Sequence, residues 1–181
     1  KPDPIVFRDM KPSNVMINHN GDVVLVDFGI AKTFQTGQKG TMIGTEGYSP
    51  PEQYRGEATP LADIYSLGAT LHHTITRRDP RLEPPFSFAE RPIRRINSNV
   101  SPEFEAVVNT ALQYNPADRF PNTAAMKDAL LNVARKTGML SKVVSALPVS
   151  SGGVKPLWSF KCEDEIRGTP VLNQGALYIG C

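Results

Sequence analysis

Apolar, valine-rich runs near the start of the chain predict a β-hairpin. They cover residues 15–18 and 22–26, and an Asn-Gly pair at 20–21 separates them. Asn-Gly between apolar runs favours a two-residue hairpin turn, because both turn residues need positive φ. That turn places Asn14 directly opposite Asp27. Opposed residues point to the same face of a hairpin with Cβ atoms about 5 Å apart, so the open end would bring an amide oxygen to a carboxylate.

From residue 59 the spacing of apolar positions becomes helical. Thr59 can cap a helix whose first position is Pro60. Few charges occur in this stretch, so we expect the helix to be buried on nearly all sides. The residues that recur at intervals of three and four are Leu61, Ile64, Leu67, Gly68, Leu71 and Ile75.

Two more helices are predicted further along the chain. A Ser-Pro pair at 101–102 opens the first, and the Asn-Pro pair at 115–116 ends it. The second runs from about Thr123 to Lys136, with Gly138 as its stop. Residues 77–99 are rich in proline and arginine and indicate a loop with short helical pieces.

The character of the chain changes after the last predicted helix. Residues 145–156 are rich in serine, glycine and proline, which is typical of a linker. Short apolar runs from Trp158 to Cys181, with an Asn-Gln-Gly turn between two of them, predict β-strands. Because the first residue is Lys1 and the last run stops inside a predicted strand, we expect the sequence to be a fragment.

Composition narrows the range of functions. The 181 residues are 40% hydrophobic, enough for one core or one core and part of another. A net charge of +2 with no block of like charges does not favour nucleic acid as a partner. Neither the two cysteines nor the three histidines have metal-ligand spacing, and His19, His72 and His73 are expected in turns and on helix surfaces. No apolar run approaches the roughly 20 residues needed to span a membrane.

A polar cluster interrupts the apolar surroundings of the predicted hairpin. If Asn14 and Asp27 are opposed, their oxygens suit Mg²⁺, which takes one or two protein ligands and several waters or phosphates. Asp9 lies on the loop that enters the same end, and Lys11 follows it. A carboxylate that can accept a hydroxyl proton, a cation and a metal site together favour phosphoryl transfer. For any one of these residues alone, a polar loop that caps a hairpin is the simpler interpretation.

The motifs together resemble the C-terminal lobe of a eukaryotic-type protein kinase. A dozen matches in the right order and spacing are not chance, and they cover about residues 1–137. The segments that carry the resemblance are Arg-Asp-Met-Lys-Pro-Ser-Asn at 8–14, similar to the catalytic loop; Asp-Phe-Gly at 27–29, similar to the metal-binding motif; Gly-Thr at 44–45 and Tyr-Ser-Pro-Pro-Glu at 48–52, similar to the end of the activation segment; Asp-Ile-Tyr-Ser-Leu-Gly at 63–68, similar to the start of the central helix; and Asn-Pro-Ala-Asp-Arg-Phe at 115–120, similar to the closing arginine motif.

The resemblance implies an α+β fold, a mainly helical kinase C-terminal lobe with a catalytic β-hairpin, over residues 1–137. A linker over 138–156 and a short β segment over 157–181 would follow. The implied activity is that of a serine/threonine kinase, since Lys11 is typical of that class, with ATP and Mg²⁺ as cofactors. The implied partners are a protein substrate and the N-terminal lobe of the same chain, without which the fragment is expected to be inactive and to expose an apolar interface.

The family's functional residues transfer to matching positions here. Asp9 would be the catalytic base, and Lys11 would contact the transferred phosphate. Asn14 and Asp27 would hold two Mg²⁺ ions. Thr45 would contact Asp9 and Lys11 and help shape the substrate site.

Other positions carry architectural or regulatory roles in the family. Glu52 and Arg119 would form a buried ion pair, and Asp63 would accept hydrogen bonds from the backbone of the catalytic loop. Arg8, next to the catalytic aspartate, implies control by phosphorylation of the activation segment. Its phosphate would bring a charge of about −1.5 to −2; Thr41 is the favoured acceptor among the nearby threonines.

An alternative stays open, a pseudokinase or signalling scaffold. Phe7 stands where the family has a histidine that packs under the Asp-Phe-Gly motif, and no Gly-rich loop precedes it within the sequence. The kinase part is expected in the cytoplasm, and a membrane tether outside the sequence is left open.

The end of the chain carries a separate resemblance. Trp-Ser-Phe at 158–160, Gly-Thr-Pro-Val at 168–171 and Leu-Tyr-Ile-Gly at 177–180 are similar to the opening of a PQQ-like β-propeller repeat. Because one repeat cannot bury its faces alone, it would be held loosely without its neighbours. A stray β-hairpin is the other interpretation. In a longer protein a propeller would serve as a sensory or docking domain.

Overall fold

The chain forms two compact units, residues 1–148 and 149–181, which are treated separately. The second contains the short antiparallel pair β5 (Val171–Asn173) and β6 (Ala176–Tyr178), in which Leu172 pairs with Leu177. This confirms a hairpin at the predicted place, and most of the expected linker lies outside the described residues. The computed structural model describes residues 5–19, 21–29, 32–33, 44–57, 59–139, 171–173 and 176–178.

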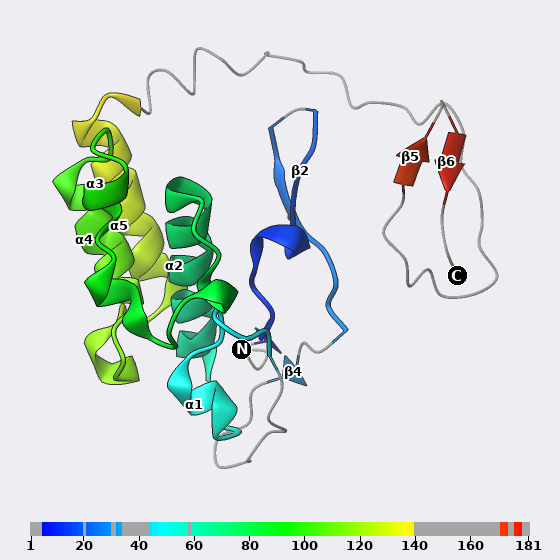
Figure 1. Cartoon of the computed structure of the whole chain (residues 1–181), viewed down its shortest axis with the longest axis horizontal. Helices are drawn as coiled ribbons and strands as arrows, with labels where there is room; N and C mark the ends of the chain where they lie inside the picture. The colour runs from blue at the N-terminus through cyan, green and yellow to red at the C-terminus, as the bar shows by residue number, and fades with distance from the viewer. Residues whose placement is uncertain are drawn as a thin grey trace. The chain divides into compact units, whose positions relative to one another are not determined.

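The first unit is mainly helical, and its helices cluster around the long α2 (Figure 1). A short 3₁₀ turn, η1 (Pro12–Asn14), precedes the first hairpin, and three more lie between the helices: η2 (Pro80–Leu82), η3 (Ser87–Glu90) and η4 (Pro116–Asp118). The α-helices are α1 (Pro51–Tyr54), α2 (Pro60–Thr76), α3 (Ile93–Ile96), α4 (Pro102–Ala111) and α5 (Thr123–Lys136).

Helix α2 begins as its sequence predicts. The Thr59 side chain accepts a hydrogen bond from the Leu61 amide at 3.3 Å, and Pro60 occupies the first helical turn. Only Thr74 of the helix is exposed, which confirms burial on nearly all sides. Residues on its different sides enter two hydrophobic clusters, one built around Tyr65 and the other around Ile64.

The two later helices differ in how well their ends were predicted. Helix α5 has the predicted bounds, with Asn122 as its cap and Gly138 at φ 68°. Helix α4 starts at the predicted Ser-Pro pair but ends at Ala111, before the predicted Asn-Pro stop. The chain turns at Leu112, and the Asn-Pro pair instead opens η4, where the Asn115 side chain caps the Ala117 amide.

The predicted hairpin is present, but its register is wrong by one residue. In β2 (Val15–Ile17) and β3 (Val23–Leu25), Val15 pairs with Leu25, and the carbonyl of Asn14 accepts from the Val26 amide at 3.0 Å. Asn14 therefore lies opposite Val26 and not Asp27. The connection has three residues instead of two, with Gly21 in the left-handed region at φ 83°, the geometry of a three-residue hairpin loop.

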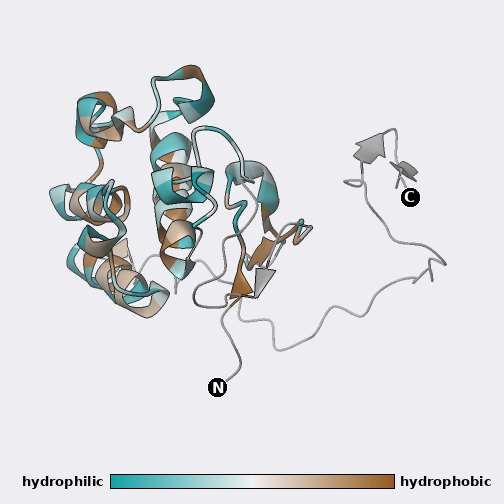
Figure 2. Cartoon of the chain, turned by 90° about the horizontal axis from the view of Figure 1, so that it is seen from below, coloured by the Kyte–Doolittle hydropathy of each residue, from teal (hydrophilic) through white to brown (hydrophobic). Residues whose placement is uncertain are grey.

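The hairpin exposes apolar side chains on both of its faces. Met16 and Val24 form one exposed pair, and Ile17 and Val23, 71% and 65% exposed, form the next. Figure 2 shows hydrophobic colour along this ribbon. Apolar surface of this kind is typical of an interaction site, and its exposure agrees with the expectation that the sequence presents an apolar interface.

One histidine is placed differently from the prediction. His72 is 1% exposed and its Nε2 lies 2.8 Å from the carbonyl oxygen of Arg91. Burial lowers the pKa of His72, although the hydrogen bond to Arg91 opposes the shift. His72 is therefore a neutral core residue of α2, because it lies on a side of the helix that packs against other parts of the unit.

The ion pair between Glu52 and Arg119 joins separate parts of the helical unit. The fork is bidentate, with Nη1–Oε1 and Nη2–Oε2 distances of 2.6 and 3.0 Å, and both side chains are buried. An arginine has five N–H donors, and all are used here. The other acceptors are the carbonyl oxygens of Leu61, Gln113 and Tyr114. The predicted pair is thus confirmed and ties α1 to α2 and to the end of α4.

Replacing Arg119 with methionine should destabilise the protein by about 3–5 kcal/mol, because the Glu52 carboxylate stays buried without a charge partner. Arg135→Met is the matched control, since Arg135 is exposed on α5; its cost should stay within about 0.5 kcal/mol. Chemical denaturation of the full-length protein measures both. Equal midpoints for the two variants would contradict a structural role for the pair.

Candidate active site

The side chain of Asp63 in α2 binds the backbone of the loop formed by residues 7–10. The two carboxylate oxygens accept from the amides of Phe7 and Arg8, each at 2.8 Å. Burial raises the pKa of Asp63, while the hydrogen bonds from Arg8 and Phe7 act in the opposite direction. These are the contacts predicted for Asp63, and they fix the direction in which the loop leaves strand β1 (Ile5–Val6).

Two further residues that sequence reasoning missed hold the same loop. Gln53 Nε2 donates to the carbonyl of Arg8 at 2.8 Å. The Thr70 hydroxyl lies between two carbonyl oxygens, that of Ser66 in its own helix at 2.8 Å and that of Met10 in the loop at 3.2 Å. A signal for Thr70 existed in the chain. Residues 63, 66 and 70 are polar and follow the i, i+3, i+7 spacing of one helix stripe on an otherwise apolar helix, so they mark the side that meets a backbone loop.

Three polar side chains meet at the Asp9 carboxylate. Its Oδ1 accepts from the Thr45 hydroxyl at 2.5 Å, and its Oδ2 lies 2.8 Å from Lys11 Nζ and 2.9 Å from Asn14 Nδ2. Lys11 Nζ also donates to Thr45 Oγ1 at 3.0 Å. The structure thus brings together Asp9, Lys11, Asn14 and Thr45, although Thr45 is 36 residues from Asp9 along the chain.

The contacts of Asp9 keep its carboxylate ionised. Burial raises the pKa of Asp9, but hydrogen bonds from Lys11, Thr45 and Asn14 and the charge of Lys11 outweigh it, so the pKa lies below its usual 3.8. At neutral pH the group is an anion that can accept a hydrogen bond from a hydroxyl. Its basicity is low, so it orients a hydroxyl more readily than it removes the proton beforehand.

Asn14 and Asp27 offer hard oxygen atoms. Both donor contacts of the Asn14 amide nitrogen go to Asp9, to its carbonyl oxygen and its Oδ2, so the Oδ1 atom is the one able to bind a cation. The Asp27 side chain is exposed, with the Gly29 amide 3.4 Å from Oδ1. An amide oxygen and a carboxylate suit Mg²⁺, which needs few protein ligands. Among the described residues, no three His, Cys, Asp or Glu side chains converge as a metal cage.

Two non-glycine residues at this site have left-handed backbones. Arg8 has φ 71° and Asp27 has φ 62°. Such conformations cost about 1–2 kcal/mol and are kept where surrounding contacts enforce them, often at functional sites. For Arg8 those contacts are the hydrogen bond that its amide donates to Asp63 and the one that its carbonyl accepts from Gln53. For Asp27, leaving the extended conformation means that strand alternation no longer sets its side-chain direction, so the shifted hairpin register does not decide where its carboxylate points.

Phe7 packs against the phenylalanine of the Asp-Phe-Gly motif. The rings of Phe7 and Phe28 lie 5.0 Å apart between centroids in an edge-to-face arrangement, and Phe7 is buried. This is the packing role expected of the aromatic residue at position 7. Strand β1 also pairs with β4 (Lys32–Thr33), through Ile5 with Thr33, which joins the chain before the loop to the chain after the motif. Thr41 lies outside the described residues.

Comparisons with known proteins agree with the motifs. The family described as protein kinase domain matches residues 3–131. Similar curated proteins include the serine/threonine-protein kinase PknB of Mycolicibacterium smegmatis, 38% identical over 143 residues, which are 71% of this chain and 23% of that protein. PknL of Mycobacterium tuberculosis is 32% identical over 147 residues, 75% of this chain and 37% of that protein. PknA of a Nostoc strain is 36% identical over 136 residues, 70% and 24% of the two chains.

The chain therefore spans between 23% and 37% of the length of these relatives. Within the described part of the chain, no helix is both long enough and apolar enough to cross a membrane.

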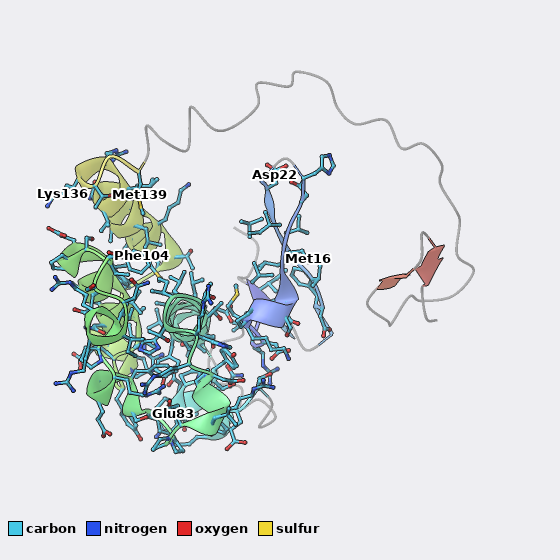
Figure 3. All side chains as sticks on the ribbon, turned by 45° about the horizontal axis from the view of Figure 1, so that its top comes forward. Met16, Asp22, Glu83, Phe104, Lys136 and Met139 are labelled. Carbon is cyan, nitrogen blue, oxygen red and sulfur yellow. The ribbon has the colours of Figure 1, made fainter. Side chains whose placement is uncertain are left out.

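Replacing Lys11 with methionine should raise the pKa of Asp9, because burial remains while the hydrogen bond and positive charge are lost. In the unaltered protein the pKa lies below 3.8, so the stability that Asp9 contributes is complete above that pH and is lost as pH falls through the folded pKa. A carbon-13 NMR titration of the Asp9 carboxyl measures the shift. Lys136→Met, on the exposed end of α5 (Figure 3), should leave the titration unchanged; the same curve in both variants would contradict the assignment.

Proposed function

The chain belongs to the protein kinase family, whose domain matches residues 3–131, and on this premise we propose that it forms part of a serine/threonine kinase. The full protein would transfer the γ-phosphoryl group of ATP to serine or threonine hydroxyls of a protein substrate. The observation that carries this proposal is the convergence of Lys11, Asn14 and Thr45 on the Asp9 carboxylate. Such a cluster has a catalytic use that the architecture of the lobe alone does not require.

Asp9 is proposed to act as the base. Its ionised Oδ1, which accepts from Thr45 here, would accept the hydrogen bond of the substrate hydroxyl and take its proton as that oxygen bonds to phosphorus. Lys11, 2.8 Å from the same carboxylate, lies close enough to neutralise charge on the transferred group. Thr45 holds both side chains in place, which reduces the entropy that must be lost in the reaction.

Asn14 and Asp27 are proposed as the magnesium ligands. Their amide and carboxylate oxygens fit the donor preference of the ion, as the direction of the Asn14 amide supports. When bound, Mg²⁺ would offset charge on the phosphates of ATP. Arg8 and Thr41 are proposed as the regulatory pair, the threonine as phosphate acceptor and the arginine as its partner; the closeness of Arg8 to Asp9 along the chain supports this.

For residues 157–181 we propose the start of a PQQ-like β-propeller repeat. The hairpin of β5 and β6 supports it, since each blade of a propeller is built from adjacent antiparallel strands. In the full protein this region would bind a partner or ligand and report to the kinase part. Sequence beyond residue 181 without further repeats of this kind would contradict the proposal.

Replacing Asp9 with asparagine in the full-length protein should lower phosphate transfer from Mg-ATP by on the order of 10²–10⁴. Asn keeps the shape of the side chain, so the loss would report on the carboxylate. Asp22→Asn is the matched control, because Asp22 is exposed at the tip of the β2–β3 hairpin, far from Asp9 (Figure 3). Transfer of radiolabelled phosphate to a mixed protein substrate measures the rate.

Asp27→Ala should also abolish most of the transfer and should weaken binding of Mg-ATP relative to ATP alone. Binding of nucleotide in the absence of any transfer, in the unaltered protein, would favour a pseudokinase or scaffold. Equal rates for Asp9→Asn and Asp22→Asn would overturn the role of Asp9.

A further inference from the structure

A pocket of about 400 Å³ lies at one end of the helical unit. It does not include Asp9, but Glu46 in its lining directly follows Thr45, which contacts Asp9. Its wall is aromatic: the ring of Phe86 lies 6.1 Å from that of Tyr54 and 5.7 Å from that of Tyr114, both edge to face. Glu46 and Glu83 also line it. Figure 3 shows Glu83 at the opposite end of the helical unit from Lys136 and Met139.

Phe86 holds its ring in this pocket at a cost in backbone energy. Its φ is 58°, a conformation that a bulky residue rarely adopts and that costs about 1–2 kcal/mol. Glycine would adopt it without strain. Phe86 nevertheless remains 39% exposed, so part of its apolar surface is open to a ligand. A strained residue that presents a half-exposed ring to a pocket indicates a binding role.

The pocket is connected to the reacting centre through one turn. Glu46 follows Thr45, whose hydroxyl contacts Asp9. Gly47 packs on the next loop so closely that an added Cβ would lie 2.7 Å from the backbone carbon of Pro80. Since an extended chain covers about 3.3 Å per residue, a peptide whose hydroxyl lies at Asp9 reaches the rim of the pocket within a few residues.

The charges at the rim favour a cation beside the apolar ligand. Glu83 is shared by Arg78 at 3.8 Å and Arg91 at 3.7 Å, and Arg55 pairs with Glu57 at 3.5 Å. Glu46 is exposed and forms no ion pair within the described part of the chain. An arginine or lysine of a bound peptide would complement it, while rings and prolines take an apolar side chain.

We propose that this pocket docks the protein substrate through an apolar side chain next to a basic one, in the segment that carries the acceptor hydroxyl. The inference rests on the proposed kinase function and adds to it a rule for substrate choice. Phe86 supplies the apolar contact, and Glu46 supplies the attraction for the basic residue.

Phosphorylation of threonine peptide pools by the full-length protein tests the proposal. Each pool fixes leucine or arginine at one position near the threonine. The unaltered protein should prefer leucine at one position and arginine at a neighbouring one. Phe86→Gly, which relieves the backbone strain, should lose about tenfold of the leucine preference through KM, with kcat retained. Glu46→Gln should lose only the arginine preference. Leu82→Ala is the control, since Leu82 is exposed on η2 and does not line the pocket.

The same pools, added without nucleotide and followed by fluorescence anisotropy, separate this proposal from the kinase function. Binding that depends on Phe86 without any transfer would overturn only the kinase function. Profiles and binding unchanged by Phe86→Gly would overturn the docking site. A change from dimer to monomer in Phe86→Gly with an unchanged peptide profile would also overturn it and assign the pocket to a second copy of the chain.

Discussion

The hydrogen bonds between Asp63 and the backbone of the loop are the constraint on which the rest of the site depends. A loop between a strand and a 3₁₀ turn has no regular partners for its amides and carbonyls, and unpaired buried groups are costly. Here side chains from α1 and α2 supply them: Asp63 accepts from two amides, Gln53 donates to one carbonyl, and the Thr70 hydroxyl contacts another. The position of the Asp9 carboxylate is therefore set by α1 and α2, which lie far from it in sequence.

This arrangement explains why the helical unit needs a rigid anchor. Gln53 is on the short α1, which cannot be stable by its own hydrogen bonds. The adjacent Glu52 is fixed by Arg119 from the other end of the unit. Arg119 also stacks over the ring of Tyr65 in α2 at 4.9 Å. Arg119, which does not contact Asp9, thus fixes the position of α1, and Gln53 of α1 holds the loop that contains Asp9.

Much of the fold and of the candidate site could be predicted from the sequence, because local signals and family motifs agreed. The cap of α2, the bounds of α5 with Gly138 after its end, and the Glu52–Arg119 pair are at their predicted places. The hairpin register was not, since an Asn-Gly pair is compatible with a two-residue and a three-residue loop, and the structure has the three-residue loop with Gly21 at positive φ. Asp63 was predicted because it belongs to a family motif; Gln53 and Thr70 hold the same backbone but belong to no motif, and only the polar stripe of α2 marks Thr70.

The turn after Gly44 shows how one short segment serves two surfaces. The carbonyl of Thr45 accepts from the amides of Tyr48 and Ser49, so the turn is closed on itself. The Thr45 hydroxyl faces Asp9, whereas Gly47 meets the loop that leads to the pocket. A side chain at position 47 would push against the backbone there, and a closed turn cannot absorb the shift without moving Thr45. The two surfaces are therefore coupled through the geometry of the turn, and a peptide held at the pocket would bear on the position of the hydroxyl that orients Asp9.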